Sequence, residues 1–164
     1  MEILKMDGMI DDKTTVQILE YKPYHQPWFE SLNRAWIEKY FWMEPVDMLV
    51  LQHPDDYIIK NGGAILMAYW KNEVAGTVAL KFADEGVYEF TKMAVHEKFQ
   101  GKGIGQALTK AAIQRAKQLG ASRIILYSNT VLAPAIALYR KNGFREIHVD
   151  GPYERSDIKM ELML

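Results

Sequence analysis

The chain has 164 residues and a mass of 18.9 kDa, the usual size of one domain, and its 20 Lys and Arg against 21 Asp and Glu exclude a generic nucleic-acid binder. The absence of cysteine excludes disulfides, Cys-ligated metal sites and a cysteine nucleophile, and the four scattered histidines form no metal motif. No apolar run approaches the roughly 20 residues of a membrane span, and the acidic start MEILKMDGMIDDK is unlike a signal peptide, so we expect a cytoplasmic protein with no membrane partner.

The first half of the chain is expected to hold one strand, two helices and a strand-rich block. Alternation predicts a strand over residues 14–21, and apolar residues near helical spacing predict an amphipathic helix over 27–41. A second short helix is expected over residues 46–52, stopped by Pro54. Strands over residues 64–70, 74–82 and 87–95 follow, separated by turns, and this order predicts an antiparallel meander.

After residue 95 the hydrophobic period changes from that of a strand to that of a helix. Apolar residues recur at helical spacing from Ile104 to Leu119, and Gly120 suits the position after the helix end. A strand over 123–127, a helix over 134–141 and strands over 144–149 and 158–163 complete the chain. We expect a single α+β (α/β) domain over residues 1–164, with a mixed sheet and one right-handed parallel crossover from strand 87–95 to strand 123–127.

Acidic residues are missing from one long part of the chain. Residues 98–145 contain nine Lys and Arg but no Asp or Glu, although the whole chain has 21 acids. A solvated surface can carry such a segregation by chance, yet 48 consecutive residues make chance the weaker explanation. We favour a local positive field for a multiply charged anion, such as a phosphorylated cofactor.

The sharpest local feature is the run Gln100-Gly101-Lys102-Gly103-Ile104-Gly105, which lies between a predicted strand and a predicted helix. Glycines let the backbone approach a ligand, and the first helical turn presents unpaired N–H groups that suit a diphosphate. A flexible turn without a ligand is the plainer alternative. The run matches neither a P-loop, which needs Lys followed by Ser or Thr, nor the G-x-G-x-x-G dinucleotide fingerprint with its acid about 20 residues on.

The pattern Gln100-x-x-Gly103-x-Gly105 resembles motif A of the GNAT acetyltransferase superfamily. Met93-Ala94-Val95 stands before it at a strand end, and AIALYRKNGF at 135–144 looks like the family's motif B. The stretches EFTKMAV at 89–95 and YERSDIKMEL at 153–162 are similar to a bacterial subgroup that occurs alone or fused to a DNA-binding domain, for which this chain has no room. The resemblance runs from about residue 15 to the C-terminus.

The resemblance implies a GNAT fold in which two splayed parallel strands seat the pantetheine arm of acetyl-CoA. Main-chain groups of Met93, Ala94 and Val95 would pair with that arm, and the amides of residues 101–105 would hold the pyrophosphate, with Gln100 lining the loop. The ribose phosphate would meet one of three basic side chains, Lys102, Lys98 or Arg140. Asn129 resembles the asparagine that contacts pantetheine, although the ten residues from Asn129 to Tyr139 exceed the family's commoner spacing.

The resemblance also implies an N-acetyltransferase whose acceptor amine attacks the thioester directly. Tyr139 matches the tyrosine that protonates the departing thiolate, although a purely structural tyrosine is the alternative. Glu89 is the candidate base, because strand alternation would place it on the same face as Thr91, Met93 and Val95. A role of Glu89 in binding the substrate ammonium is equally open. The amide of Val95 or of its neighbour is the candidate oxyanion donor.

The acceptor is expected to be a primary amine on a small molecule or peptide, bound by the front of the chain. Aromatic residues gather there between Trp28 and Trp42, and Glu44, Asp47, Asp55 and Asp56 follow as an acidic wall that would suit a cation or would equally be solvated helix ends. The four histidines are isolated, and each is expected to be a surface or hydrogen-bonded histidine rather than a catalytic one. A CoA-binding sensor without turnover is the second hypothesis, and a nucleotide-binding module unrelated to CoA is the third. The family also allows a homodimer through the C-terminal strands.

Overall fold

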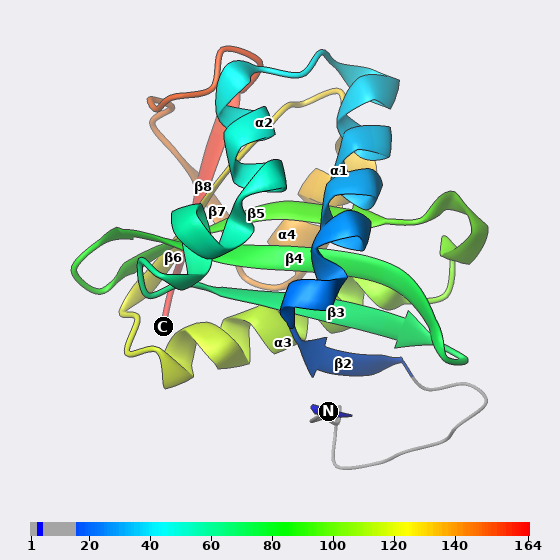
Figure 1. The fold of residues 1–164 in the computed structure, drawn as a ribbon. Helices are drawn as coiled ribbons and strands as arrows, with labels where there is room; N and C mark the ends of the chain where they lie inside the picture. The colour runs from blue at the N-terminus through cyan, green and yellow to red at the C-terminus, as the bar shows by residue number, and fades with distance from the viewer. Residues whose placement is uncertain (1–2, 5–15) are drawn as a thin grey trace.

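One mixed sheet of eight strands forms the centre of the protein, whose structure is a computed structural model that describes residues 3–4 and 16–164 (Figure 1). In spatial order the strands are β1 (Ile3–Leu4), β2 (Gln17–Glu20), β3 (Ala64–Trp70), β4 (Glu73–Asp84), β5 (Val87–Val95), β6 (Arg123–Ser128), β8 (Ile158–Met163) and β7 (Arg145–Ile147). Neighbouring strands are antiparallel except β5 and β6, which are parallel. The expected mixed sheet is confirmed, while residues 14 and 15 of the first predicted strand lie outside the described residues.

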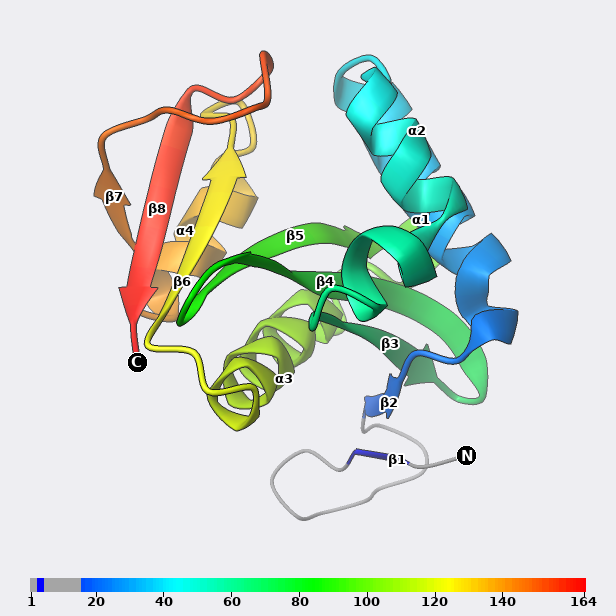
Figure 2. The ribbon, with the colours of Figure 1, turned by 60° about the vertical axis from the view of Figure 1, so that its left-hand side comes forward.

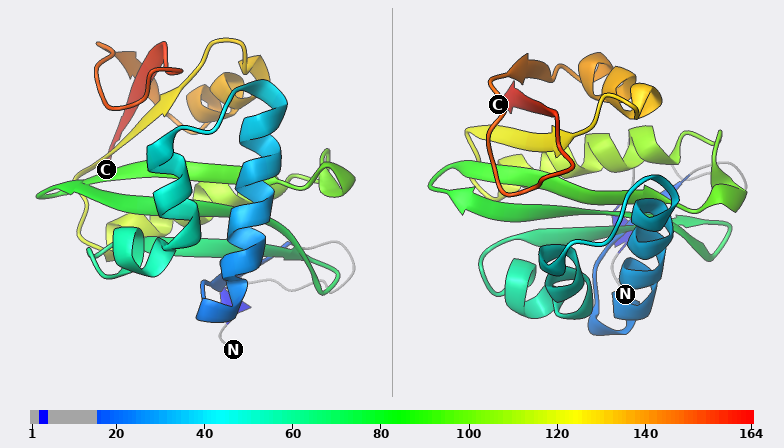
Figure 3. Two further views of the ribbon diagram at one scale, coloured as in Figure 1. Left: turned by 45° about the horizontal axis from the view of Figure 1, so that its top comes forward. Right: turned by 90° about the horizontal axis from the view of Figure 1, so that it is seen from above.

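The helices cover both faces of this sheet (Figure 3). On one face, α1 (Gln26–Tyr40) and α2 (Pro45–Gln52) bury Phe29 and Leu51 against β3 and β4. On the other face, α3 (Ile104–Gln118) and α4 (Ala133–Lys141) pack Leu108 and their other apolar residues against β5 and β6. Each helix was predicted within one or two residues, because its apolar residues recur at helical spacing.

Residues in the turns have the backbone conformations that those turns require. Lys71 and Asn72, which join β3 to β4, both have positive φ angles of 47° and 68°, the conformation that a tight hairpin needs. Gly120 follows α3 with a φ of 85° and ends that helix as expected. A helical turn over Asp55–Ile59 was not predicted, because Pro54 was interpreted only as a helix stop, whereas it initiates this next turn.

The parallel pairing between β5 and β6 is short. It comprises three residue pairs, from Val87 with Arg123 to Glu89 with Ile125. Beyond these pairs β5 stays with β4 as far as Val95, whereas β6 stays with β8 as far as Ser128. The two strands therefore diverge, and Figure 2 shows β6 and β8 turned away from β3, β4 and β5. The predicted splay of the parallel strands is confirmed.

A β-bulge at Lys92 makes the predicted alternation of β5 wrong. Thr77 of β4 pairs with Ala94 and Ala79 pairs with Thr91, so β5 has one extra residue between these pairs, and Lys92 has a φ of 55°. Because the extra residue reverses the alternation, Met93 and Val95 pack on the core beside α3, whereas Lys92 reaches α2 on the opposite face. Glu89 therefore does not share a face with Met93 and Val95.

Candidate active site

A cleft of about 390 Å³ opens where β5 and β6 diverge. Its walls come from α1, from β5, from β6 with the loop that follows it, from α4, and from the loop between β7 and β8, which we call the 148–157 loop. The volume is that of a small-molecule pocket. The cleft brings together Glu89, Met93, Ala94, Val95, Gln100, Gly105, Asn129 and Tyr139, all of which were predicted as site residues.

The glycine loop stands at one end of this cleft, at the N-terminus of α3. Gly101 and Gly103 have φ angles of 81° and 79°, and a Cβ atom built on either one would meet no atom within 4 Å. The first hydrogen bond within α3 runs from the Ala107 amide to the Gly103 carbonyl, so the amides of the preceding turn have no helical acceptor. A left-handed, open loop beside free amides fits a diphosphate.

The other residues of the loop have different environments. Ile104 is buried in the core beside α3 and so anchors the helix start rather than lining the cleft. The Lys102 ammonium lies 5.2 Å from the centre of the Trp70 ring. Lys98 pairs with Glu73 at 3.4 Å, and Arg140 pairs with Glu146 at 3.6 Å.

Carboxylates from outside the acid-free stretch reduce the positive charge that we expected to concentrate there. Five of its nine bases pair with such carboxylates: Lys98, Arg115, Arg123, Arg140 and Arg145. Their partners, Glu20, Glu73, Glu146 and Glu161, therefore offset part of the charge of the stretch. Lys102 is the base that lies in the glycine loop itself.

Tyr139 lies on α4 and lines the cleft. Its ring packs edge-on against Phe90 at 5.6 Å and Phe144 at 6.0 Å between ring centres. Burial raises the pKa of its phenol above the ordinary value, so the hydroxyl keeps its proton at neutral pH. The side chain is at once a core residue and a proton-bearing group on the cleft wall, so its packing does not exclude the predicted role.

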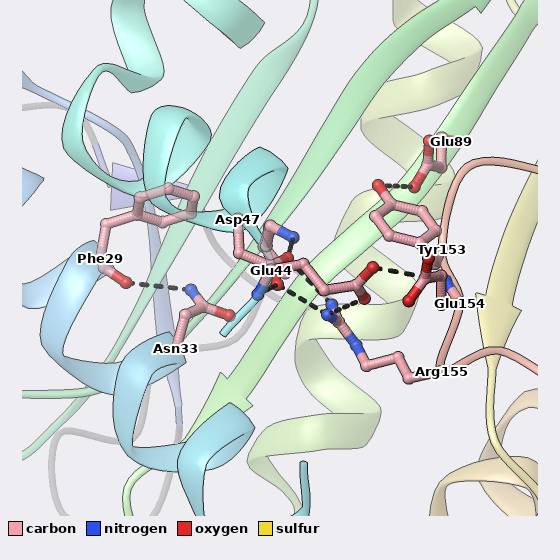
Figure 4. Close-up of polar contacts among 9 residues, drawn as sticks. Phe29, Asn33, Glu44, Asp47, Glu89, Tyr153, Glu154 and Arg155 are labelled. Atoms are coloured by element: carbon pink, nitrogen blue, oxygen red, sulfur yellow. Dashed lines mark hydrogen bonds and ion pairs between the residues drawn. The ribbon is translucent and has the colours of Figure 1, made fainter. Parts of the chain in front are cut away.

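Glu89 lies at the point where β5 and β6 separate, and its carboxylate accepts a hydrogen bond of 2.9 Å from the Tyr153 hydroxyl (Figure 4). Only 7% of Glu89 is exposed. Burial raises the pKa of Glu89, against the opposing effects of the Tyr153 hydrogen bond and of nearby Lys81 and Lys92. A carboxylate whose pKa is raised above its ordinary value is a stronger base, which suits a general base.

A buried network of opposite charges lies beside Glu89. The Arg155 guanidinium donates to Glu44 at 2.6 Å and to both carboxylate oxygens of Asp47 at 2.6 and 2.9 Å (Figure 4). The Lys92 ammonium donates to Asp47 at 2.7 Å, with both side chains almost fully buried. The network joins α2 and β5 to the 148–157 loop, and so ties the two walls of the cleft together.

The network changes the ionisation of its members. Burial opposes the charge on Asp47, but hydrogen bonds from Arg155 and Lys92 prevail and lower its pKa to about 2. Burial lowers the pKa of Lys92, and Asp47 counteracts that effect.

Glu44 and Asp47 therefore already have cationic partners, and Asp56 pairs with Lys60 at 2.9 Å. None of the four residues of the expected acidic wall, Glu44, Asp47, Asp55 and Asp56, lines the cleft, so they form no wall for a cationic acceptor there.

Asn129 lines the cleft, but both ends of its side chain are engaged. Its amide nitrogen donates to the Arg155 carbonyl at 2.7 Å, and its oxygen accepts from the Val131 amide at 3.0 Å. Asp157 accepts from the Thr130 amide and hydroxyl nearby. Asn129 thus fastens the 148–157 loop to the end of β6. Its contact with pantetheine stays a prediction.

The aromatic residues of the front segment divide between the core and the cleft. Phe29 is fully buried, whereas Trp36, Tyr40 and Phe41 line the cleft from α1 and its C-terminal end. Asn33, one turn before Trp36, also lines it and donates to the Phe29 carbonyl at 2.9 Å. The front of the chain therefore forms one wall, as the sequence suggested.

Among the cleft residues that sequence reasoning missed are the charged Lys92 and Arg155 and the hydrogen-bonding Tyr153. Lys92 was placed on a regular strand, and a single-residue bulge leaves no local signal. Tyr153 and Arg155 stand in the stretch YERSDIKMEL, which was interpreted only as a family likeness.

His25 is a buried, hydrogen-bonded histidine, as expected. It accepts a hydrogen bond from the Lys22 amide, and its ring contacts the Tyr69 hydroxyl at 2.8 Å.

Within residues 3–4 and 16–164, the acidic and histidine side chains form no group of three that could hold a metal ion. None of the helices in this part of the chain combines the length and apolar character needed to span a bilayer.

Known proteins resemble this chain in sequence. The profile of the Acetyltransferase (GNAT) family matches residues 24–144. The uncharacterized N-acetyltransferase YvbK of Bacillus subtilis is 33% identical over 112 residues, which cover 65% of this chain and 71% of YvbK. A mycothiol acetyltransferase of Saccharomonospora viridis is 40% identical over 73 residues, which cover 44% of this chain but only 24% of that protein. The chain thus spans about a quarter of this relative's length.

Solved structures share the fold. An acetyltransferase of the GNAT family from Staphylococcus aureus superposes with a TM-score of 0.80 at 19% identity, covering 90% of this chain and 98% of that one. A phosphinothricin acetyltransferase from Sinorhizobium meliloti, solved in complex with acetyl-CoA, gives 0.76 at 18% identity, covering 92% and 89%. The divergent strands, the glycine loop and the matched profile agree, and the predicted family is confirmed: the chain belongs to the acetyltransferase (GNAT) family.

Proposed function

We propose that this protein transfers an acetyl group from acetyl-CoA to a primary amine of a small molecule or peptide, within a ternary complex. The observation that carries the proposal is the cleft at the divergence of β5 and β6. Its lining includes the buried carboxyl of Glu89, the protonated phenol of Tyr139, and the two ends of the glycine loop, Gln100 and Gly105, whereas residues 101–104 lie outside the lining. Relatives named as N-acetyltransferases and as mycothiol acetyltransferases support the reaction class.

Two regions of the protein suit two parts of acetyl-CoA, its pyrophosphate and its pantetheine arm. The left-handed glycines and the amides that open α3 suit its pyrophosphate, and Lys102 is the nearest base of the loop. The unpaired edge of β5 at Met93, Ala94 and Val95 suits its pantetheine amides, which would pair with it as a strand does. Acetyl-CoA, when bound, supplies the acetyl group on an activated thioester carbon.

The two ionisable side chains would then divide the proton transfers. Glu89 takes the proton that the acceptor ammonium must lose before its nitrogen can attack. Tyr139 gives its hydroxyl proton to the sulfur as the carbon–sulfur bond breaks and the carbon–nitrogen bond forms. Backbone amides at the end of β5, near Val95, donate to the carbonyl oxygen as negative charge develops on it. The ammonium nitrogen loses two protons in all, one to Glu89 before the attack and one as the amide forms. One of these replaces the proton that Tyr139 gives to the sulfur and the other is released to solvent, so the transfer is balanced.

The test is thiol release from acetyl-CoA with a panel of primary amines, together with the mass of the acceptor. We expect release that depends on the amine and a product heavier by one acetyl group. A protein that binds CoA but releases no thiol with any amine would instead be the CoA-binding sensor that is the second candidate. A homodimer through the C-terminal strands, and a single domain over all 164 residues, stay predictions.

A further inference from the structure

We propose that the acceptor is a small arylalkylamine, which carries one ammonium group and one aromatic ring but no carboxylate. The inference rests on the proposed function, because it names the acceptor of the same cleft. Three properties of the described cleft carry it: the balance of its charges, the aromatic side chains on its two walls, and its size.

Three charged side chains line the cleft, namely Glu89, Lys92 and Arg155. Arg155 is held by Glu44 and Asp47, and Lys92 is held by Asp47, all at 2.9 Å or less. Glu89 contacts the neutral phenol of Tyr153 and forms no ion pair within the described residues. Glu89 is therefore the lining charge without an ion-pair partner among the described residues, since Lys81 and Lys92 act on it only at longer range, and it can accept one ammonium group.

This balance discriminates between classes of amine. An amino acid that binds through its ammonium group would also bring its carboxylate close to Glu89, which would repel it. The two cations that line the cleft, Lys92 and Arg155, are already held by carboxylates, so the added carboxylate would have no cationic partner. A polyamine would bring a second ammonium into the cleft, where no second free carboxylate is present among the lining residues. An acceptor with one positive charge and no negative charge therefore matches the charges that line the cleft.

Aromatic rings stand on both walls. Trp36 and Tyr40 of α1 lie 4.7 Å apart between ring centres on one wall. Tyr127 of β6 and Tyr153 of the 148–157 loop lie 5.5 Å apart on the other. Aromatic walls favour an aromatic ligand through stacked and edge-on contacts, beyond the area that such a ligand buries. The ring of the acceptor would therefore lie between α1 and the 148–157 loop.

The size of the cleft sets an upper limit on the acceptor. Its 390 Å³ must hold the end of the pantetheine arm and the acceptor together. This is near the lower end of the range for pockets that hold one drug-sized ligand. A single ring with a short alkyl amine fits the space that remains better than a folded peptide or an oligosaccharide.

The experiment uses two pairs of amines that differ by one charge, and one pair that differs by the ring. Phenylalanine adds a carboxylate to 2-phenylethylamine, 1,4-diaminobutane adds an ammonium to butylamine, and ethylamine lacks the ring. For each amine we would measure kcat/KM by thiol release and the Kd for the protein saturated with CoA. We expect 2-phenylethylamine to exceed both phenylalanine and ethylamine by about tenfold or more in kcat/KM, and butylamine to exceed 1,4-diaminobutane.

A variant tests whether the ring binds where we place it. Trp36→Ala should lower kcat/KM for 2-phenylethylamine by about fivefold, the loss expected for an aromatic contact, and should change ethylamine little. Trp28→Ala is the matched control, since Trp28 lies on the same helix, is 47% exposed and does not line the cleft. Equal losses for the two amines in Trp36→Ala would contradict this placement.

The outcomes separate the acceptor class from the reaction. If phenylalanine or 1,4-diaminobutane is acetylated as efficiently as its matched amine, the class is wrong and the transferase stands. If no amine releases thiol, but 2-phenylethylamine binds the CoA-saturated protein and loses affinity in Trp36→Ala, the class stands and the reaction is wrong. If 2-phenylethylamine neither reacts nor binds, the acceptor class is overturned.

Discussion

The Tyr153 hydroxyl donates a 2.9 Å hydrogen bond to the Glu89 carboxylate across 64 residues of sequence. The two residues belong to opposite walls of the cleft, Glu89 to β5 and Tyr153 to the 148–157 loop. Burial and the neighbouring Glu89 raise the pKa of Tyr153, so the phenol stays protonated and acts as a donor. The contact therefore stabilises the charged form of Glu89 and orients its carboxylate.

Tyr153→Phe should move the acid limb of the pH profile of kcat/KM to higher pH. Glu89 acts as a base only when ionised, so activity rises as the pH passes its pKa, and losing a donor to the anion raises that pKa. A hydrogen bond to a charged group contributes about 1.5–3 kcal/mol, which corresponds to about one to two pH units. Tyr69→Phe, which removes a hydroxyl bound to His25 away from the cleft, should leave the limb in place. An unmoved limb in Tyr153→Phe would show that the contact does not tune Glu89.

Glu89→Gln distinguishes the two roles that remain open for this residue. As the base, Glu89 should be needed for turnover, so kcat should fall by about 10²–10⁴ with acetyl-CoA affinity unchanged. As a group that only binds the ammonium, it should affect the KM for the amine and leave kcat nearly intact. Steady-state kinetics at saturating acetyl-CoA separate these results.

Tyr139→Phe should keep the affinity for CoA and the melting temperature but reduce turnover. The phenyl ring preserves the packing against Phe90 and Phe144, so the change isolates the hydroxyl. Loss of a general acid costs about 10²–10⁴ in rate. The matched control is Tyr88→Phe, which removes a hydroxyl bound to the Gly62 carbonyl outside the cleft. A kcat within about twofold of the wild type would reject Tyr139 as the acid.

Gly103→Asp should lower the affinity for CoA at least tenfold, which is about 1.4 kcal/mol. The new carboxylate would stand at the start of α3, where the pyrophosphate is expected, and would repel it. Gly120→Asp is a close control, because Gly120 also has a positive φ, with open space around it, at the opposite end of the same helix. Calorimetry on both variants separates the charge at the site from the strain of the backbone. Equal affinities in folded Gly103→Asp and wild type would remove the glycine loop from the binding site.

Asp47→Asn should destabilise the protein and flatten its stability at low pH. Removing one partner of a buried ion pair typically costs about 3–5 kcal/mol, and here both Lys92 and Arg155 would lose an anion. The folded pKa of Asp47 is lowered to about 2, so its contribution is present above the unfolded pKa of about 3.9 and is lost as the pH falls through about 2. Denaturant unfolding between these pH values should show this loss in the wild type and its absence in Asp47→Asn. Asp56→Asn, which alters an exposed pair with Lys60, should have little effect.

The parts of the fold that could be predicted are those whose signal is local. The helix face from Ile104 to Leu119 and the meander of β3, β4 and β5 depend on hydrophobic period and turn residues, both of which stand in the sequence itself. The glycine loop could also be found, because the residues that shape it are consecutive. The charge of residues 98–145 could not be judged from the stretch alone, because the carboxylates that pair with its bases come from other elements of the fold.

The site could be predicted only in part, because its charged groups meet across long separations. Arg155 and Asp47 are 108 residues apart and belong to segments that no period connects. The bulge at Lys92 depends on pairing with β4 and reverses which face the later residues of β5 occupy. The sequence suggests Glu89 and Tyr139 as candidates, but the neighbours that set their pKa values become visible only once the chain is folded.

The short ladder between β5 and β6 gives the sheet two unpaired strand edges in its interior, in addition to those at its rim. An exposed edge normally invites a strand of another molecule, and repeated pairing of that kind leads to polymers. Here the two edges face one another, and the 148–157 loop, fastened by Arg155 and Asn129, closes the space beside them. A further strand needs room for side chains on both of its faces, which this walled space restricts. The loop therefore limits the pairing of a foreign strand with either edge, and so limits self-association through the backbone of β5 and β6.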